Sequence, residues 1–410
     1  MNIIENGGVT LAKGFAAANC AAAIKYKTGR PDMAMIFSKS PCVAAGTYTT
    51  NVVKAAPVKW DREITDGGRE VHAVVVNAGI ANACTGEEGF SYCKETAKTV
   101  EEVLNVPFEG VCVASTGVIG MQLPMDRVNN GVKMLAKALD ESEAAGHEAA
   151  KAIMTTDTVP KEAGASFVTS DGKEVKIGGM CKGSGMIHPN MCTMLGFITT
   201  DCAISHELML KALRADIEDT FNMVSVDGDT STNDSVILLA NGEAGNKKIE
   251  SEGGDFELFK EALNHVTKTL AKKIAADGEG ATALFEVNVK NCESKAKAKV
   301  LAKSVVCSSL TKAAIYGHDA NWGRILCALG YSGAQFDPEK VDLYFESEAG
   351  SLKIIEDGVA CDYSEEFATQ ILSKPHVIAI CDMKEGNEEA TAWGCDLTHK
   401  YVDINADYRS

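Results

Sequence analysis

One stretch near the middle of the chain holds the residue types that a self-cleaving acyl-transfer enzyme needs. It runs from Lys182 to Asp201 and reads Lys-Gly-Ser-Gly-Met-Ile-His-Pro-Asn-Met-Cys-Thr-Met-Leu-Gly-Phe-Ile-Thr-Thr-Asp, a glycine-rich turn that leads into an apolar strand. Within it the small residue Cys192 precedes the hydroxyl residue Thr193. Cleavage between them would free the α-amine of Thr193 to act as a base for its own hydroxyl, the nucleophile.

Simpler interpretations of this stretch stay open. A phosphate-binding loop requires Gly-Lys-Ser/Thr behind an earlier glycine, whereas Lys182 precedes its glycine. A flexible turn is the other alternative, and the turn residues taken alone favour it. Catalysis is favoured by the combination of a cation, three turn residues (Gly183, Gly185 and Pro189) and a Cys–Thr bond just before a strand.

Two further loops carry groups that could assist acyl transfer. Ser115-Thr-Gly-Val-Ile-Gly120 follows a predicted strand, and its Thr116 and Gly117 could present a hydroxyl and a backbone amide to a developing oxyanion. Asp277-Gly-Glu-Gly-Ala-Thr282 follows a predicted helix, and its Glu279 could bind an ammonium group. An ordinary turn is the alternative at both places.

Three polar segments match no catalytic motif. Thr155–Thr158 predicts a local turn stabilised by its aspartate. Val226–Asp234 lacks the sixth-position glycine and the twelfth-position glutamate of a calcium loop, so a loop rich in Asx and Ser/Thr turns is favoured. Gly317–Arg324 contains adjacent His and Asp residues, which are not sufficient to predict a catalytic dyad.

The composition predicts an acidic globular protein. Its 410 residues can form a large core in two or three subdomains, and a net charge of −17 argues against nucleic acid and anionic membranes as main partners. The 14 cysteines are scattered without a Cys-x-x-Cys pair, which argues against a metal site. Neither a leader-like N-terminus nor an apolar run of spanning length occurs, so we expect a cytoplasmic protein.

The periodicity of apolar residues indicates which elements position these groups. Helices are predicted at about 91–104, 125–139, 142–154, 206–221 and 256–275. Strands are predicted at 34–37, 73–76, 111–114, 223–226, 236–240 and 283–289, with a hairpin of 165–169 and 174–177. Interleaved helices with hairpin-linked strands favour an α+β sandwich over a doubly wound sheet.

Taken together, these segments resemble the ornithine acetyltransferase family, the bifunctional glutamate N-acetyltransferases of arginine biosynthesis. The resemblance covers nearly the whole chain, and its most specific part is the Lys-Gly-Ser-Gly-Met string that continues to Pro-Asn-Met-x-Thr-Met-Leu. The other matching segments are Thr49–Pro57, Asn82–Gly86, Ser115–Gly120, Thr155–Pro160, Val226–Asp234, Asp277–Thr282, Asn321–Ile325 and Ile404–Ser410.

The resemblance implies an enzyme made as one chain and working as two. Cleavage before Thr193 would give an alpha chain, residues 1–192, and a beta chain, residues 193–410, which stay together and assemble as a heterotetramer of two each. The implied fold is an αββα-like sandwich similar to, but distinct from, N-terminal-nucleophile hydrolases. The implied reaction passes the acetyl group of N2-acetylornithine to glutamate in ping-pong fashion, without a cofactor, and some members also use acetyl-CoA as a donor.

The resemblance also implies roles for individual residues. Thr193 matches the nucleophile that carries the acetyl group, Cys192 matches the residue before the cut, and Thr116 and Gly117 match the oxyanion-hole pair. The positions that match substrate contacts are Thr156, Lys182, Thr193, Glu279, Asn405 and Ser410. No metal ligand is implied.

Three residues depart from the family pattern. Cys192 replaces alanine but is still small, Ser410 replaces threonine but keeps the hydroxyl, and Ala283 replaces a lysine, which puts any role of that cation in doubt. Two other functions also stay open. One is an N-terminal-nucleophile amidase or aminopeptidase that passes the acyl group to water, and the other is an uncut binding or scaffold protein.

Overall fold

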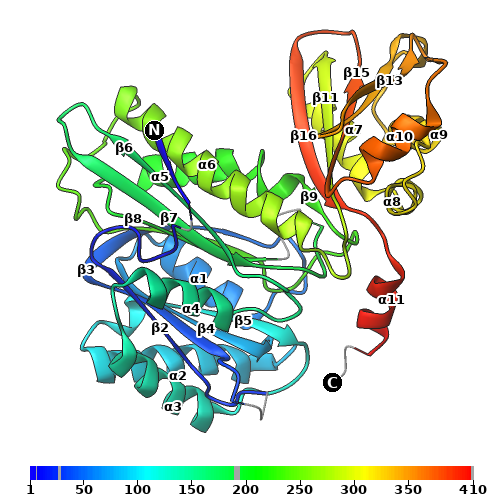
Figure 1. Ribbon diagram of the computed structural model, residues 1–410. Coiled ribbons are helices and arrows are strands. Elements are labelled where there is room, and N and C mark those ends of the chain that lie inside the picture. Colours follow the sequence, from blue (N-terminus) through cyan, green and yellow to red (C-terminus); the bar gives the residue numbers. More distant parts are fainter. Residues whose placement is uncertain (6, 26–28, 189–193, 408–410) are drawn as a thin grey trace. The chain divides into compact units, whose positions relative to one another are not determined.

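The computed structural model describes residues 1–5, 7–25, 29–188 and 194–407, and the chain forms two compact units (Figure 1). The first unit comprises Met1–Gly183, Asn190–Phe221 and Thr230–Leu270. The second comprises Ser184–Pro189, Asn222–Asp229 and Ala271–Ser410. Each unit contains residues from both sides of the predicted cleavage position, so the units differ from the predicted alpha and beta chains.

Within the described residues, the strands of the first unit form one continuous path. They are β1 (Asn2–Ile4), β2 (Phe15–Cys20), β3 (Met33–Tyr48), β4 (Val71–Ile80), β5 (Val111–Val118), β6 (Lys161–Val168), β7 (Glu174–Lys182), β8 (Leu195–Thr200) and β10 (Ser235–Ala240). Their order is β1-β6-β7-β8-β10-β3-β4-β5, with β2 paired to β3. The long strand β3 belongs to two sheets, because Val43–Tyr48 pairs with β10 whereas Met33–Phe37 pairs with β2 and β4.

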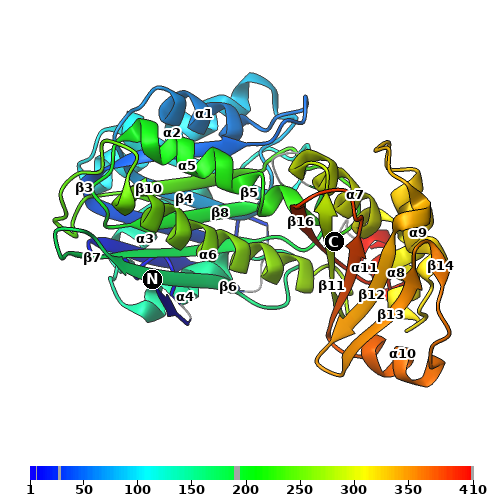
Figure 2. The same cartoon turned by 90° about the horizontal axis from the view of Figure 1, so that it is seen from above.

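The helices in the described part of this unit are α1 (Ala56–Asp66), α2 (Gly86–Leu104), α3 (Met125–Ala138), α4 (Glu143–Ala152), α5 (His206–Ile217) and α6 (Gly254–Ala276). Five of these six cover the outer faces of the two sheets, and α4 contacts β2 and β3 as well as β6 and β7. Helices α5 and α6 lie over β3, β7 and β8, and α1, α2 and α3 pack on β2, β3 and β5 (Figures 1 and 2). The resulting order of helix, sheet, sheet and helix confirms the predicted αββα-like sandwich.

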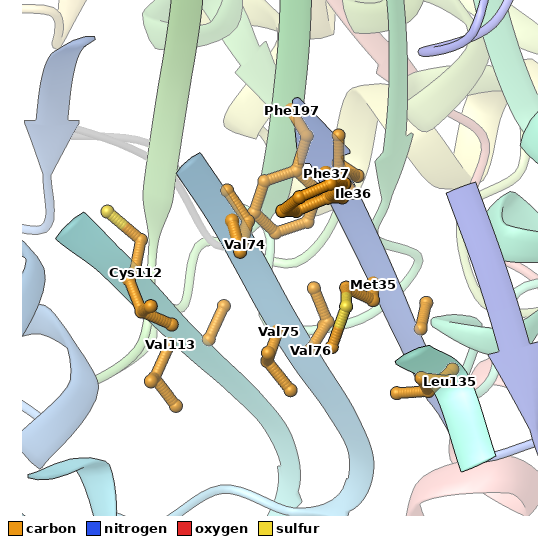
Figure 3. Packing of buried hydrophobic residues seen from close by; sticks show 14 of the residues in the cluster. Met35, Ile36, Phe37, Val74, Val75, Val76, Cys112, Val113, Leu135 and Phe197 are labelled. Atoms are coloured by element: carbon orange, nitrogen blue, oxygen red, sulfur yellow. The ribbon is translucent and has the colours of Figure 1, made fainter. Parts of the chain in front are cut away.

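The core of the first unit includes side chains of both sheets and of the helices α2 and α3. Figure 3 shows Phe197 of β8 close to Ile36 and Phe37 of β3 and to Val74 of β4, and all four belong to one buried cluster. Fully burying such a side chain contributes about 1.5–3 kcal/mol relative to leaving it exposed. Since β4 is buried along almost its whole length, its sequence is a nearly continuous apolar run rather than an alternating one.

The second unit is built on a mixed sheet. Its strands are β9 (Val224–Ser225), β11 (Leu284–Cys292), β12 (Asp342–Ser347), β13 (Gly350–Glu356), β14 (Val359–Ala360), β15 (His376–Asp382) and β16 (Glu388–Cys395), in the order β14-β13-β12-β15-β11-β16-β9. Its helices are α7 (Lys295–Cys307), α8 (Ser309–Tyr316), α9 (Trp322–Gly330), α10 (Glu365–Leu372) and α11 (His399–Ala406). Helix α7 packs on β11 and β16.

The described residues of the two units also contain short 3-10 helices, at Phe108–Gly110, Phe221–Met223 and Pro338–Lys340.

Most predicted elements occur where the periodicity placed them. The predicted helix 206–221 ends earlier, at Ile217, and the strand predicted at 34–37 continues to Tyr48. Helix α1 and strand β2 were not predicted. Among the helices of the described ranges, none combines the length and the apolar character that crossing a membrane requires.

Candidate active site

The end of β5 carries the predicted oxyanion pair. Thr116 is half-buried, and Gly117 follows it with a φ of 128°, a conformation that favours glycine. A Cβ atom at position 117 would lie 2.2 Å from the carbonyl carbon of Gly79 on β4. The close approach of the two strands therefore requires glycine at this position, whatever its chemical role.

Lys182, the last residue of β7, reaches the same place. Its Nζ lies 3.4 Å from Oγ1 of Thr116, and its side chain is only 8% exposed. On the neighbouring strand, Leu195 pairs with Lys182, two residues after Thr193. Three of the predicted site residues, Thr116, Gly117 and Lys182, are thus brought together within the first unit.

A buried carboxylate lies between two buried lysines beside this group. Oδ1 of Asp157 accepts hydrogen bonds from Lys161 Nζ and the Gly183 amide, each at 2.7 Å, and Oδ2 lies 3.9 Å from Lys182 Nζ. Burial alone would raise the pKa of Asp157, but the charges of Lys182 and Lys161 and these hydrogen bonds lower it below its ordinary value. Thr156, a predicted substrate contact, directly precedes Asp157 and is half-buried.

A second buried acid, Asp234, contacts the backbone at the start of β8. Burial raises the pKa of its carboxyl well above the ordinary value, although a hydrogen bond from the Met194 amide, one with Thr49 and the charge of Lys182 act in the opposite direction. Among the described residues, its Oδ2 has no hydrogen-bond partner. The amide that donates to this carboxyl belongs to Met194, the residue that directly follows Thr193 in the sequence.

Three predicted site residues, Cys192, Thr193 and Ser410, lie outside the described residues. Met194, which follows Thr193, is buried, and its carbonyl accepts a hydrogen bond of 3.0 Å from the amide of Ser235 on β10. The roles of Cys192, Thr193 and Ser410 remain predictions.

The second unit brings two further predicted residues together. Glu279 is 6% exposed, and its Oε2 accepts a hydrogen bond of 2.7 Å from Nδ2 of Asn405 on α11. A Cβ atom at Gly185 would lie 2.4 Å from each carboxylate oxygen of Glu279, so the absence of a side chain at position 185 leaves room for this carboxylate. The amide of Glu279 donates to the carbonyl of Ser184 (3.0 Å), which fixes the loop that follows α6.

Asp227 holds the same part of the chain in place. Its carboxylate accepts the amides of Met186 and Ile187 at 2.7 and 2.9 Å and the hydroxyl of Tyr401 at 3.3 Å. Burial and the neighbouring acids raise the pKa of Tyr401, which therefore stays a hydrogen-bond donor at neutral pH. The loop that precedes the predicted cleavage position is thus bound to α11 through one carboxylate.

Sequence reasoning missed two of these charged groups. Lys161 opens a buried strand and is fully buried, and a lysine beside an apolar run is the signal that could have indicated an internal ion pair. Asp234 was interpreted as part of a turn, although it directly precedes the apolar strand β10. In the described ranges, no group of three or more His, Cys, Asp or Glu side chains is arranged to hold a metal ion.

Comparisons with known proteins agree over almost the full length. A family model described as the ArgJ family matches residues 16–410. The arginine biosynthesis bifunctional protein ArgJ of Thermotoga neapolitana is 51% identical, over 97% of this chain and 99% of its own. The protein with the same name from Symbiobacterium thermophilum is also 51% identical, over 98% of this chain and 99% of its own.

Two solved structures are also similar. The crystal structure of the arginine biosynthesis bifunctional protein argJ of Bacillus halodurans is 45% identical, with a TM-score of 0.50, and covers 52% of this chain and 99% of its own. The ornithine acetyltransferase of Mycobacterium tuberculosis, complexed with ornithine, is 41% identical with a TM-score of 0.42, and covers 46% of this chain and 97% of its own.

Proposed function

This chain belongs to the ArgJ family, and we propose that it transfers the acetyl group of N2-acetylornithine to glutamate through an O-acetyl-Thr193 intermediate. Membership of the family makes it an acyltransferase enzyme of arginine biosynthesis. The observation that carries the proposal is the convergence of Thr116, Gly117 and Lys182 in the first unit. Lys182 is paired there with Leu195, two residues after the proposed nucleophile.

The proposed enzyme first cuts its own chain. The Thr193 hydroxyl attacks the carbonyl carbon of Cys192, the C–N bond breaks as its nitrogen gains a proton, and water hydrolyses the resulting ester. The match to the Bacillus halodurans structure supports two chains, because that solved chain covers 52% of this chain but 99% of its own. A beta chain of residues 193–410 would be about 53% of the 410 residues.

Acetyl transfer then uses the freed amino terminus. An α-amine has an intrinsic pKa of about 7.7–8.0, so that of Thr193 can accept the hydroxyl proton near neutral pH. The oxygen of Thr193 attacks the acetyl carbonyl, and Thr116 Oγ1 and the Gly117 amide donate to the developing oxyanion. Each such donor lowers the barrier by about 3–4 kcal/mol. Ornithine leaves as the amine, glutamate enters, and its α-amine takes the acetyl group from Thr193.

Charged residues are proposed to bind the two amino acids. Ornithine and glutamate share an α-carboxylate, for which the buried ammonium of Lys182 is a suitable partner. The carboxylate of Glu279, held by Asn405, suits the side-chain ammonium of ornithine. Thr156 and Ser410 complete the proposed contacts with hydroxyl groups. Acetyl-CoA as a second donor, a cytoplasmic location and a heterotetramer of two alpha and two beta chains are parts of the same proposal.

Incubation with N2-acetylornithine, with and without glutamate, tests the reaction. With both substrates we expect N-acetylglutamate and ornithine in equal amounts. Without glutamate we expect at most one equivalent of ornithine per Thr193. Continuous release of acetate without glutamate would instead identify an amidase.

Two variants of the nucleophile complete the test. Thr193→Ala should remain a single chain on a denaturing gel and transfer no acetyl group, whereas Thr193→Ser keeps a hydroxyl and should still give two bands. Two bands from the alanine variant, or full transfer by uncut wild-type protein, would contradict the proposed nucleophile.

A further inference from the structure

Along part of the outer edge of β5, the backbone amides and carbonyls form hydrogen bonds with side chains rather than with another strand. Because β5 is last in the strand order, every second residue turns its amide and carbonyl away from β4. Trp60 Nε1 donates to the Val111 carbonyl at 2.9 Å, and the Val113 amide donates to Asp61 Oδ1 at 2.7 Å. Such partners are needed because buried backbone groups are unfavourable when unpaired.

Asn233 provides the next partner along this edge. Its Nδ2 donates to the carbonyls of Ser115 at 2.8 Å and Ala81 at 2.6 Å, and its Oδ1 accepts the Thr232 hydroxyl at 2.6 Å. Two carbonyl oxygens on one side and a hydroxyl donor on the other leave a single orientation for the amide. The side chain is buried, so these bonds are not exchanged for water.

These bonds hold the chain on both sides of the oxyanion pair. After residues 111, 113 and 115, the alternation places Gly117 next on the outer edge, and the following carbonyl, that of Val118, accepts the Ala81 amide at 2.9 Å. The Gly117 amide therefore points away from β4, to the side where no strand of the described residues pairs with β5. Asn233 holds the carbonyls of Ser115 and Ala81, so it restrains both strands at this point.

A second buried amide reinforces the arrangement. Asn77 Oδ1 accepts the Ser115 hydroxyl at 2.6 Å, and its Nδ2 donates to the carbonyl of Ile80 at 2.9 Å. Ile80 lies where the register between β4 and β5 shifts. Ser115 is thus fixed through its hydroxyl by Asn77 and through its carbonyl by Asn233.

We propose that Asn233 is a positioning residue for acyl transfer: its amide fixes the peptide between Ser115 and Thr116 and so aims the Thr116 hydroxyl and the Gly117 amide at the oxyanion. It acts through these two donors and touches no substrate. The inference rests on the proposed function. Loss of the amide leaves two carbonyls unheld, and a displacement of about 1 Å at a reacting centre can lower the rate about 100-fold.

Asn233→Ala and Asn246→Ala form a matched pair for the test. Asn246 is equally buried in the first unit, and its Nδ2 donates to the carbonyls of Ala203 and Lys247 at 3.2 and 2.9 Å. It follows β10, whereas Asn233 precedes that strand, so the two amides lie near opposite ends of it. Both variants should lower the melting temperature by a similar amount. Only Asn233→Ala should lower kcat, by about 10- to 100-fold with KM nearly unchanged.

Hydrogen exchange gives a readout that does not depend on turnover. Asn233→Ala should speed exchange of the Ala81 amide, which donates to the Val118 carbonyl at 2.9 Å, and Asn246→Ala should leave it as in the wild type. If Asn233→Ala does not fold, Thr232→Val removes only the hydroxyl that orients the amide. We expect that variant to fold and to lose about 2- to 5-fold in kcat.

The outcomes separate this inference from the proposed function. Wild-type protein that transfers no acetyl group would refute the proposed function. If the wild type is active but Asn233→Ala keeps the wild-type kcat and exchange rates, the positioning role alone is refuted. Where Asn233→Ala does not fold, the same result for Thr232→Val refutes it. An equal loss of kcat in Asn246→Ala would refute it as well, because it would show a general effect of stability.

Discussion

Replacing Gly117 by alanine is the most direct perturbation of the proposed oxyanion hole. The new Cβ would lie 2.2 Å from the carbonyl carbon of Gly79 and 2.4 Å from its oxygen. Unstrained carbon atoms approach to about 3.5 Å, so the two backbones must separate by roughly 1 Å or more. Because β5 is the edge strand, we expect it to move away from β4 and to carry the Gly117 amide with it.

The size of the effect follows from this displacement. Losing one oxyanion donor lowers kcat by about 100- to 1000-fold, and KM should change little because the ground state does not depend on this donor. Overpacking costs about 1–3 kcal/mol and an alanine at a φ of 128° adds about 1–2 kcal/mol, so the free energy of unfolding should fall by roughly 2–5 kcal/mol.

Gly120→Ala is the matched control. Gly120 also has a positive φ, 84°, but a Cβ atom there meets nothing within 4 Å. It should therefore lose only about 1–2 kcal/mol from backbone strain and keep nearly all of its kcat. Both variants are measured by urea unfolding and by acetyl transfer from N2-acetylornithine at saturating glutamate. Equal kcat values for the two variants would show that the close approach of Gly117 to β4 has no part in catalysis.

Three further changes have defined outcomes. Asp157→Asn leaves two buried lysines without their carboxylate, so urea unfolding should show a loss of about 3–5 kcal/mol. Burial raises the pKa of Asp61 above its unfolded value, so this carboxyl lowers stability as pH rises from about 4 towards its folded pKa, by up to about 1.4 kcal/mol per pH unit. Because other buried acids such as Asp234 act in the same direction, Asp61→Asn should show a shallower decline than the wild type. Glu279→Gln removes a charged acceptor and should raise KM for N2-acetylornithine by roughly 10- to 100-fold, measured by initial rates.

Each of these changes has a control on the same unit. Asp171→Asn alters an exposed aspartate and should lower the free energy of unfolding by no more than about 1 kcal/mol. An equally small loss for Asp157→Asn would contradict the stabilising role of Asp157 between Lys161 and Lys182. Asp66→Asn lies on the same helix as Asp61 but at an exposed position, and it should keep the wild-type pH dependence. Glu348→Gln changes an exposed acid of the second unit, and equal KM values for it and Glu279→Gln would exclude the proposed ammonium site.

The sequence predicted the sandwich because apolar periodicity reports directly on burial. Most strands of the first unit are apolar on one or both faces, and α3 and α6 begin and end within two residues of their predicted limits. Helix α1 was missed because its buried face includes polar side chains such as Asp61, whose partner is a backbone amide of β5. A single sequence contains no signal that pairs an aspartate with an amide about fifty residues away.

The candidate site was predicted less completely for the same reason. Thr116, Gly117 and Lys182 were identified through motifs, and they do meet in the first unit. Asn233 and Asp234 lie in a loop that resembled a run of turns, and their contacts depend on which strand ends lie beside them. Such relations are set by the order of strands in the sheet, which local sequence patterns do not determine.

The position of the proposed cut explains how one chain can become two without losing its site. β7 precedes the cut and β8 follows it, and the two pair from Ile177–Thr200 to Lys182–Leu195. β8 is buried on both faces and also pairs with β10 along its whole length. The proposed cut breaks none of these hydrogen bonds, so we expect Leu195 to stay paired with Lys182. The described chain that follows the proposed cut therefore begins one residue before a buried strand paired on both sides, and catalytic groups supported by such an element are held more precisely than groups on a loop.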